Sequence, residues 1–511
     1  MKQISQQFFD ETVVSNMELL DLNEDEAIEE TAQSFTLEGV DLSNIVKDMV
    51  KYKNGHPCTI SLKELCDLLE ADSPDYSRIN SVVENLREQS DINFSHRKLL
   101  HTMGVLSSLE TVIDRCVYVN QRPCVVSTLR LTASVCSGQA EVFNSPSGAE
   151  FLNKLVNLLI KTLHEKEHDD LSFETISAFY SVLRTACLKN EPNRLLITGT
   201  AIISETIGWL SQIDLSSNAS HLSEKCAVLR ELFAFLRSIT LDDDMEVEFG
   251  MGSANARDIA STKSAIEVLI KVARASVELS NEQCVMDAFT TLASIITREE
   301  FCRQFTQHGG LNLVLSTLQT HRDSPLIVFG CLQLLRILCG SDDCKRALGT
   351  WSSGPGKECT GPTILVELLE RFIRNTGLVK SAAAVIAAMT LRQPDLAEHV
   401  VAAGVPEFLA KALQLHMSDS STVRAVCMAI RNCVARSADL RKAFMGSHFP
   451  PGSSHYTQSS EEASDPYELE SLLNTALAKR DCADEAKAAL RDLGCRVTLR
   501  ELWTGVPAAN S

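Results

Sequence analysis

The sequence predicts an all-α protein, a solenoid of about eight stacked three-helix repeats. The first observation behind this prediction is an apolar pattern that recurs eight times, each time around a leucine or isoleucine with an apolar residue four positions before it. Seven of the eight patterns continue with an apolar residue seven positions before the centre, which fits the 3.6-residue period of a helix and not the two-residue period of a strand. The eight central residues, called anchors below, are Leu129, Leu183, Leu236, Leu292, Leu335, Ile386, Ile430 and Leu490.

The second observation is the spacing of the anchors, which lie 43 to 60 residues apart. Stacked helical repeats of about 40 to 47 residues fit the shorter spacings, and surface loops account for the longer ones. One such repeat cannot bury its own apolar stripe, so neighbouring repeats must cover one another. Each repeat is expected to hold three helices, of which the first is short. Proteins with this architecture mostly bind other proteins.

Changes in the pattern divide the chain into four segments. Residues 1–50 are acidic but keep spaced apolar positions, which predicts an acidic N-terminal helical segment. Residues 51–95 hold a weaker pattern with proline and glycine breakers, which predicts a linker with room for capping helices. Residues 96–505 are the predicted solenoid, interrupted at 446–466 by a polar loop expected to be disordered. Residues 506–511 are a C-terminal tail.

The charge of the chain argues against two classes of partner. The formal net charge is −19, and the first fifty residues hold twelve acidic residues against Lys2 and Lys47. Binding to nucleic acid or to an anionic membrane requires concentrated lysine and arginine, so neither partner is expected. The acidic segment is expected to act as a solvated, solubilising tail. The alternative is that it binds a basic surface of the same chain or of another copy.

The cysteines and the N-terminus indicate a reducing compartment. The 17 cysteines form no C-x-x-C pair, and several lie inside helical apolar patterns, so we expect them to be reduced and buried. The N-terminus has no signal-peptide pattern, and no apolar run reaches the 18 or so residues of a membrane span. The expected location is the cytosol, the nucleus or both. We expect a monomer without cofactor, metal ion or catalytic residue.

Several segments resemble a known family. The third-helix segment I-R-N-C-V-A at residues 430–435 is similar to the corresponding consensus of armadillo repeats. Three further segments agree with patterns of an armadillo-repeat family: residues 39–47, 241–250 and 484–505. The resemblance covers nearly the whole chain, and it implies a right-handed armadillo superhelix, no enzymatic activity and a role as a protein-binding adaptor.

Arginine follows the anchor in six of the eight patterns. Stacked helices lie about 8 to 10 Å apart, so these side chains could form a ladder along the groove and bind the carboxylates of an acidic partner. The preferred interpretation is that each arginine packs between repeats and bonds to a neighbouring carbonyl or carboxylate. The six are Arg130, Arg184, Arg237, Arg336, Arg431 and Arg491.

The positions two before and two after each anchor lie about 160° from it, on the expected concave face. Nuclear-import armadillo adaptors carry tryptophan at the first position and asparagine at the second. Here tryptophan is absent from the first position, and the only asparagine at the second is Asn432. A nuclear transport adaptor is therefore a disfavoured alternative. The candidate partner-binding residues are Arg130, Arg184, Arg237, Arg336, Arg431 and Asn432.

One motif has the spacing of a catalytic zinc site. Residues 164–168 spell H-E-K-E-H, the H-E-x-x-H spacing that places two imidazoles on one helical face of a zinc protease. A solvated helix end is the preferred interpretation, because no third ligand pattern follows. A zinc-dependent hydrolase at His164 and His168 is the remote alternative. The acidic run Asp242, Asp243 and Asp244 lacks the ligand spacing of a calcium loop, so it is expected to cap or solvate a turn.

Overall fold

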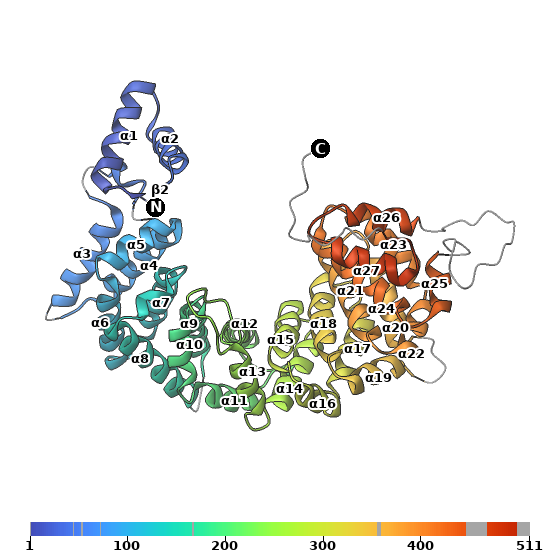
Figure 1. The fold of residues 1–511 in the computed structure, drawn as a ribbon. Coiled ribbons are helices and arrows are strands. Elements are labelled where there is room, and N and C mark those ends of the chain that lie inside the picture. Colours follow the sequence, from blue (N-terminus) through green and yellow to red (C-terminus); the bar gives the residue numbers. More distant parts are fainter. Residues whose placement is uncertain are drawn as a thin grey trace. The chain divides into compact units, whose positions relative to one another are not determined.

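The computed structural model describes residues 2–43, 45–52, 55–71, 73–165, 168–354, 359–445 and 468–497. The loop predicted at 446–466 and the tail at 506–511 lie outside these residues. The described chain is built almost entirely of helices and divides into two compact units, Met1–Ala265 and Ile266–Ser511. Figure 1 shows the order of the helices along the chain. The predicted all-α solenoid is confirmed.

The first fifty residues form a small helical segment with a core of their own. Helix α1 begins after Ser5, whose hydroxyl accepts from the Phe8 amide, and α2 begins with a capping box between Asn23 and Glu26. The core holds Phe9, Val13, Ala27, Ala32, Phe35 and Ile45. The elements are β1 (Lys2–Gln3), α1 (Gln6–Leu20), α2 (Glu24–Leu37), β2 (Val40–Asp41), which pairs in parallel with β1, and the 3₁₀ helix η1 (Met49–Lys51).

The rest of the first unit is a row of helical repeats. A two-helix pair comes first, and three repeats follow, each ending in a third helix that carries an anchor. The pair is α3 (Pro57–Glu70) and α4 (Tyr76–Ile92), and the repeats are α5 (Phe94–Thr102), α6 (Val105–Tyr118), α7 (Arg122–Cys136); η2 (Ala140–Phe143), α8 (Pro146–Leu163), α9 (Asp170–Cys187); α10 (Glu191–Thr198), α11 (Ile202–Gln212), α12 (Leu222–Ser238); with α13 (Gly252–Ser261) at the end.

The second unit repeats the same arrangement. It opens with two helices, and four complete repeats follow. The helices are α14 (Ala265–Glu278), which starts at the boundary, and α15 (Glu282–Ile295); α16 (Glu299–Gln307), α17 (Gly310–Thr320), α18 (Pro325–Leu338); α19 (Asp342–Thr350), α20 (Gly361–Arg371), α21 (Thr376–Thr390); α22 (Pro394–Ala402), α23 (Val405–His416), α24 (Ser420–Val434); α25 (Ala438–Met445), α26 (Leu469–Leu477), α27 (Ala483–Leu493).

Third helices pack side by side within each unit. Helices α4, α7, α9 and α12 make one row, and α15, α18, α21, α24 and α27 make the other. All eight anchors lie on these helices and are fully buried, and the apolar residues four positions before them are at most 5% exposed. The stripe read from the sequence is therefore the surface through which each third helix joins the core.

The turn before a second helix is sharp, as the repeat pattern requires. At Gly404, φ is +95°, a left-handed backbone that glycine adopts without steric cost, and Pro406 follows in the first turn of α23. First helices are short: α10 and α25 have eight residues each.

The cysteines are free thiols that belong mostly to this core. All 17 cysteines are free thiols, and most of them are buried. Burial raises the pKa of the thiols of Cys187 and Cys433 to about 12, so these groups stay neutral and behave as small apolar residues.

Among the residues that the structure describes, no helix has the length and hydropathy to span a membrane.

Candidate partner-binding surface

Third helices also have a second side, on which every residue named below except Ala387 is at least partly exposed. Positions six before, two before and one after the anchor lie about 100° to 160° around the helix from it, so they share one side. We call these positions on α18, α21 and α24 the third-helix face. Its members, from α18 to α24, are Phe329, Gln333, Arg336, Lys380, Ala384, Ala387, Arg424, Met428 and Arg431.

Two of the predicted ladder arginines bond to the next third helix of the first unit. Arg130 on α7 donates to Glu174 on α9 at 3.2 Å. Arg184 on α9 donates through Nε to Glu231 on α12 at 3.0 Å. Both pairs are partly exposed, with 49% of the Arg130 side chain and 34% of the Arg184 side chain accessible. In this unit the ladder therefore ties repeat to repeat within the chain.

A third ladder arginine does the same in the second unit. Arg431 on α24 donates through Nε to Asp492 on α27 at 3.2 Å, and Arg491 shares that carboxylate at 3.0 Å. Arg237 lies half-buried at the end of α12. Arg336 is different, because it is exposed and makes no ion pair or side-chain hydrogen bond with any described residue. The six arginines thus share a sequence position, but they differ in whether they bond to a carboxylate of the next repeat.

Cations and apolar groups share the third-helix face. Lys380 and Arg424 are exposed like Arg336, and within the described chain neither bonds to a carboxylate. Two large apolar side chains lie on the outer helices of the same face: Phe329 on α18 is 37% exposed and Met428 on α24 is 45% exposed. Three neighbouring helices therefore carry uncompensated positive charge beside accessible apolar surface, in a chain whose net charge is −19.

A cavity lies at the end of this face. It has a volume of about 190 Å³ and is formed where the turn after α21 meets the turn after α24, with Arg431 and Asn432 in its wall beside Leu391 and Pro394. Pockets for cofactors and drug-sized ligands are usually about 300 to 1,000 Å³. This cavity can take one side chain of a partner, but not a cofactor.

Comparison with known proteins finds similarity to armadillo-repeat proteins. A family model described as the armadillo repeat-containing protein 6 N-terminal domain matches residues 1–59. Armadillo repeat-containing protein 6 of Homo sapiens is 27% identical over 517 residues, which cover 99% of this chain and 93% of the human protein. The Drosophila melanogaster homolog is 27% identical over 395 residues, 76% of this chain and 78% of its own length. Over nearly its whole length, the chain is similar to armadillo repeat-containing proteins.

A solved structure supports the same fold. An engineered protein determined by a structural genomics consortium superposes with a TM-score of 0.55 and 17% identity, covering 85% of this chain and 98% of the engineered chain. Armadillo-repeat proteins are repeat-based interaction scaffolds and are generally not enzymes.

Asn432, the asparagine at the position that import adaptors use, is already hydrogen-bonded within the chain. Asn432 donates from Nδ2 to the carbonyl of Ala387 on the preceding third helix at 2.8 Å, so this amide N–H bonds within the chain. Other positions of the expected concave face are covered by neighbouring third helices: Leu131 is fully buried and Ser238 is 2% exposed. The assumption that these positions all line an open groove is wrong in the first unit, because its third helices pack too closely.

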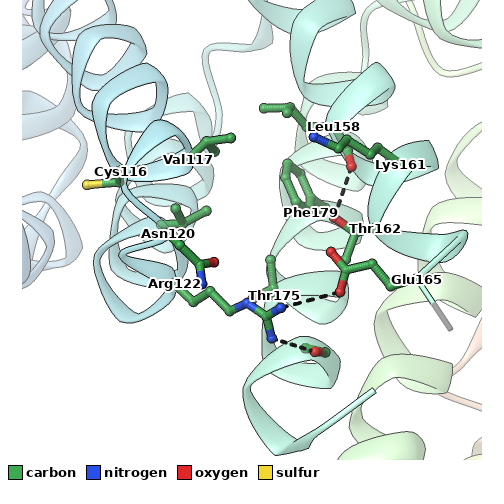
Figure 2. A pocket seen from close by; sticks show the side chains of 12 residues that line it. Cys116, Val117, Asn120, Arg122, Leu158, Lys161, Thr162, Glu165, Thr175 and Phe179 are labelled. Carbon is green, nitrogen blue, oxygen red and sulfur yellow. Dashed lines mark hydrogen bonds and ion pairs between the residues drawn. The ribbon is translucent and has the colours of Figure 1, made fainter. Parts of the chain in front are cut away.

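A second cavity of about 150 Å³ opens between two repeats of the first unit. Figure 2 shows its apolar wall, with Leu158 on α8 and Phe179 on α9. Arg122 at the start of α7 closes one side, donating to Ser172 at 3.1 Å and pairing with Glu165 at 3.7 Å. The slot is smaller than a cofactor pocket, and the bonds of Arg122 join the two repeats.

The two histidines of the H-E-x-x-H spacing do not share a helix face. Helix α8 ends at Leu163, so His164 is its C-cap residue, and His168 lies just before the first turn of α9. His164 bonds through Nε2 to Glu205 at 2.7 Å, whereas His168 packs against Phe173 and Trp209. Burial lowers the pKa of His168. The arrangement that a zinc protease needs is therefore not formed.

The aspartate run closes a buried charge network that sequence analysis did not find. Arg194 on α10 is fully buried and donates to Glu191 at 2.8 Å and to Asp243 at 2.6 Å. Asp244 accepts from the Glu191 amide at 2.7 Å, and this bond lowers the pKa of its carboxyl. Asp242 accepts from the Gly252 amide at 2.8 Å. The expectation of a capped turn is correct, and the cap also neutralises a buried guanidinium.

Proposed function

We propose that this protein is a non-catalytic adaptor that binds an acidic, apolar-containing peptide segment of another protein along the third-helix face of the Ile266–Ser511 unit. The observation that carries the proposal is the set of exposed, unpaired cations Arg336, Lys380 and Arg424, on the same face as the exposed side chains of Phe329 and Met428. An accessible apolar group beside unpaired charge is a common mark of an interaction surface.

The chemistry of the face favours carboxylates. Arginine presents a planar fork of donors that matches a carboxylate in two bonds, and a lysine adds a mobile point charge. Exposed ion pairs contribute little affinity by themselves, about 0.2 to 1 kcal/mol each. The apolar contacts with Phe329 and Met428 must therefore supply most of the binding free energy, and the cations select the partner and speed its approach.

The geometry sets the spacing of the peptide motif. Neighbouring helices lie about 8 to 10 Å apart, and an extended chain advances about 3.3 Å per residue. A peptide that runs across α18, α21 and α24 would therefore meet a new helix about every third residue. We expect a segment with acidic residues at about that interval and apolar residues between them.

A basic ligand does not suit this face. A nuclear-signal peptide would bring lysine and arginine against Arg336, Lys380 and Arg424, and like charges in contact are unfavourable. The single asparagine at the corresponding positions, Asn432, already donates to Ala387. The transport-adaptor alternative therefore has no support from the described surface.

Selection of peptides against the full-length protein tests the proposal. Random peptides displayed on phage are selected on the purified chain, and the affinity of the enriched peptides is measured by fluorescence anisotropy. We expect enrichment of aspartate and glutamate with apolar residues between them. The triple variant Arg336→Glu, Lys380→Glu, Arg424→Glu should weaken binding by at least about tenfold, which is 1.4 kcal/mol.

The matched control is Lys411→Glu. Lys411 is an exposed lysine of the same unit, but it lies on α23, a second helix. This control should bind the selected peptides as the wild type does, and far-ultraviolet circular dichroism should show both variants folded. Enrichment of basic peptides, or equal affinity of the triple variant and the wild type, would refute the proposal.

A further inference from the structure

Three buried residues that can bind metal meet at the start of the repeats. His56 is the N-cap residue of α3, Cys58 lies in the first turn of that helix, and His96 lies in α5. His56 is 2% exposed, and Cys58 and His96 are fully buried. One ligand atom from each residue lies within 4.8 Å of the other two. Buried imidazoles and thiols this close together are uncommon unless they share a proton or a cation.

Asp48 lies beside the two imidazoles, outside the group of three ligand atoms that are all within 4.8 Å of one another. It precedes η1, and its Oδ2 lies 2.8 Å from His96 Nε2 while its Oδ1 lies 3.6 Å from His56 Nε2. The two imidazole rings meet edge to face, with centroids 4.5 Å apart. Zinc bonds of about 2.0 to 2.3 Å in a tetrahedron place neighbouring ligand atoms about 3.3 to 3.8 Å apart. The present distances reach those values with movements of about an ångström.

His96 is held as a metal-binding histidine usually is. Its Nδ1 lies 2.8 Å from the Gln89 carbonyl, and a carbonyl can only accept, so Nδ1 carries a hydrogen. The Nε2 atom is thereby directed at Asp48. A ring nitrogen that bonds to a backbone carbonyl while the other faces the cation is the typical outer shell of a zinc histidine.

Two polar atoms at the centre face each other at 3.6 Å, which is too far for a hydrogen bond. Asp48 Oδ1 and His56 Nε2 are buried and make no hydrogen bond with any described residue. Leaving such atoms unsatisfied costs free energy, so an unsatisfied pair that faces one point is evidence for a missing ligand there. From these atoms, the burial and the ligand types, we propose that Asp48, His56, Cys58 and His96 bind one Zn²⁺ ion.

Charge balance supports the assignment. Without metal, both ring nitrogens of His96 face acceptors, so the ring is a cation paired with the Asp48 carboxylate, and the cluster is neutral. With Zn²⁺, the Cys58 thiolate and the Asp48 carboxylate cancel the charge of the ion, and both imidazoles are neutral. Binding therefore releases two protons, one from His96 Nε2 and one from the Cys58 thiol. The proton of His56 moves to Nδ1, which gives up its 3.2 Å bond from the Cys58 amide.

The site would fasten the N-terminal segment to the first repeat. Asp48 belongs to the segment matched by the N-terminal family model, and so do His56 and Cys58, whereas His96 belongs to α5. The metal therefore joins residues that are about 40 positions apart in sequence. A mixed nitrogen, sulfur and oxygen set suits zinc better than the oxygen-seeking ions magnesium and calcium.

Metal analysis of the full-length protein tests the site. The chain is stripped with a chelator, incubated with zinc sulfate, passed through a desalting column and measured by plasma mass spectrometry. A parallel sample takes Co²⁺, whose absorption reports tetrahedral geometry and a thiolate bond. We expect about one zinc per chain, a thiolate-to-cobalt charge-transfer band and the release of two protons per zinc in a weakly buffered titration.

Two variants and two controls complete the test. Cys58→Ser should remove the charge-transfer band, and His96→Gln should abolish stoichiometric zinc. Cys66→Ser, in the same helix, and His221→Gln, in an exposed group with Asp170 and Glu224, should change neither readout. If His96→Gln does not fold, the Cys58→Ser spectrum decides. Zinc well below one equivalent in the wild type, or binding unchanged by Cys58→Ser, would overturn the proposal.

Discussion

The guanidinium of Arg184 on α9 donates to the carboxylate of Glu231 on α12 at 3.0 Å, across the interface of two repeats. Arg130 and Arg431 make the same kind of bond to the third helix that follows their own. An arginine placed next to an anchor is therefore often used to hold neighbouring repeats together. Arg336, Lys380 and Arg424 stand out because none of them bonds to an acid in the described part of the chain.

The pair of Arg184 and Glu231 can be tested by charge reversal. Arg184→Glu places two carboxylates together and should lower the free energy of unfolding by about 1 kcal/mol or less, since the pair is partly exposed. The double variant Arg184→Glu, Glu231→Arg should recover most of this loss. Urea unfolding followed by circular dichroism measures both. A double variant less stable than Arg184→Glu would show that the pair does not join the repeats.

Anchor truncation should damage the fold locally. Leu335→Ala removes a fully buried side chain from α18 and should cost about 2 to 5 kcal/mol through the cavity it leaves. Because contacts in a solenoid are made between neighbours, hydrogen exchange should rise most in α15, α18 and α21. Lys411→Ala is the surface control and should leave exchange unchanged. A uniform rise over the whole unit would contradict the nearest-neighbour account.

The buried guanidinium of Arg194 should be sensitive to loss of its charge. Arg194→Met leaves the carboxylates of Glu191 and Asp243 without their cation, and breaking a buried pair in this way costs about 3 to 5 kcal/mol. Thermal unfolding measures the loss. Arg257→Met, an exposed arginine of α13, is the control. If both variants melt at the same temperature, the network does not stabilise the fold.

Asp244 should make stability depend on pH. Hydrogen bonds from the amides of Glu191 and Glu246 lower the pKa of its carboxyl in the folded state. A group with a lowered folded pKa stabilises the protein above its unfolded pKa, about 3.9 for aspartate, and this contribution disappears as pH falls through the folded value. The difference in melting temperature between wild type and Asp244→Ala should therefore be constant above pH 5 and shrink at lower pH. A difference that grows on acidification would contradict the assignment.

The sequence predicted the core well because burial leaves a periodic signal. All eight anchors are buried, and the fainter pattern of Ile79, Val82 and Leu86 belongs to α4, which packs against α7. The N-terminal segment was harder, because Phe8 and Leu20 are half exposed although they fit the same spacing as the buried Val13. Periodicity shows that a helix has an apolar side, but not how much of that side finds a partner.

The partners of the candidate residues could not be predicted from the periodic pattern. The acids that pair with Arg130, Arg184 and Arg431 lie at different offsets in the following repeat, so no fixed spacing reveals them. Lys380 and Arg424 could have been found by reading the position six before each anchor. Asp48 and His96 come together only because the N-terminal segment packs on α5, and nothing local in the sequence encodes that contact.

Site-specific photo-cross-linking tests the central claim most directly. A photoreactive amino acid is placed at Met428 on the third-helix face, or at Lys411 on α23 as the matched control, and each variant is irradiated with a selected acidic peptide. We expect the peptide to attach to the Met428 variant, to be displaced by unlabelled peptide, and to leave the Lys411 variant unlabelled. Equal labelling at both positions, or labelling at Lys411 alone, would contradict binding along the third-helix face.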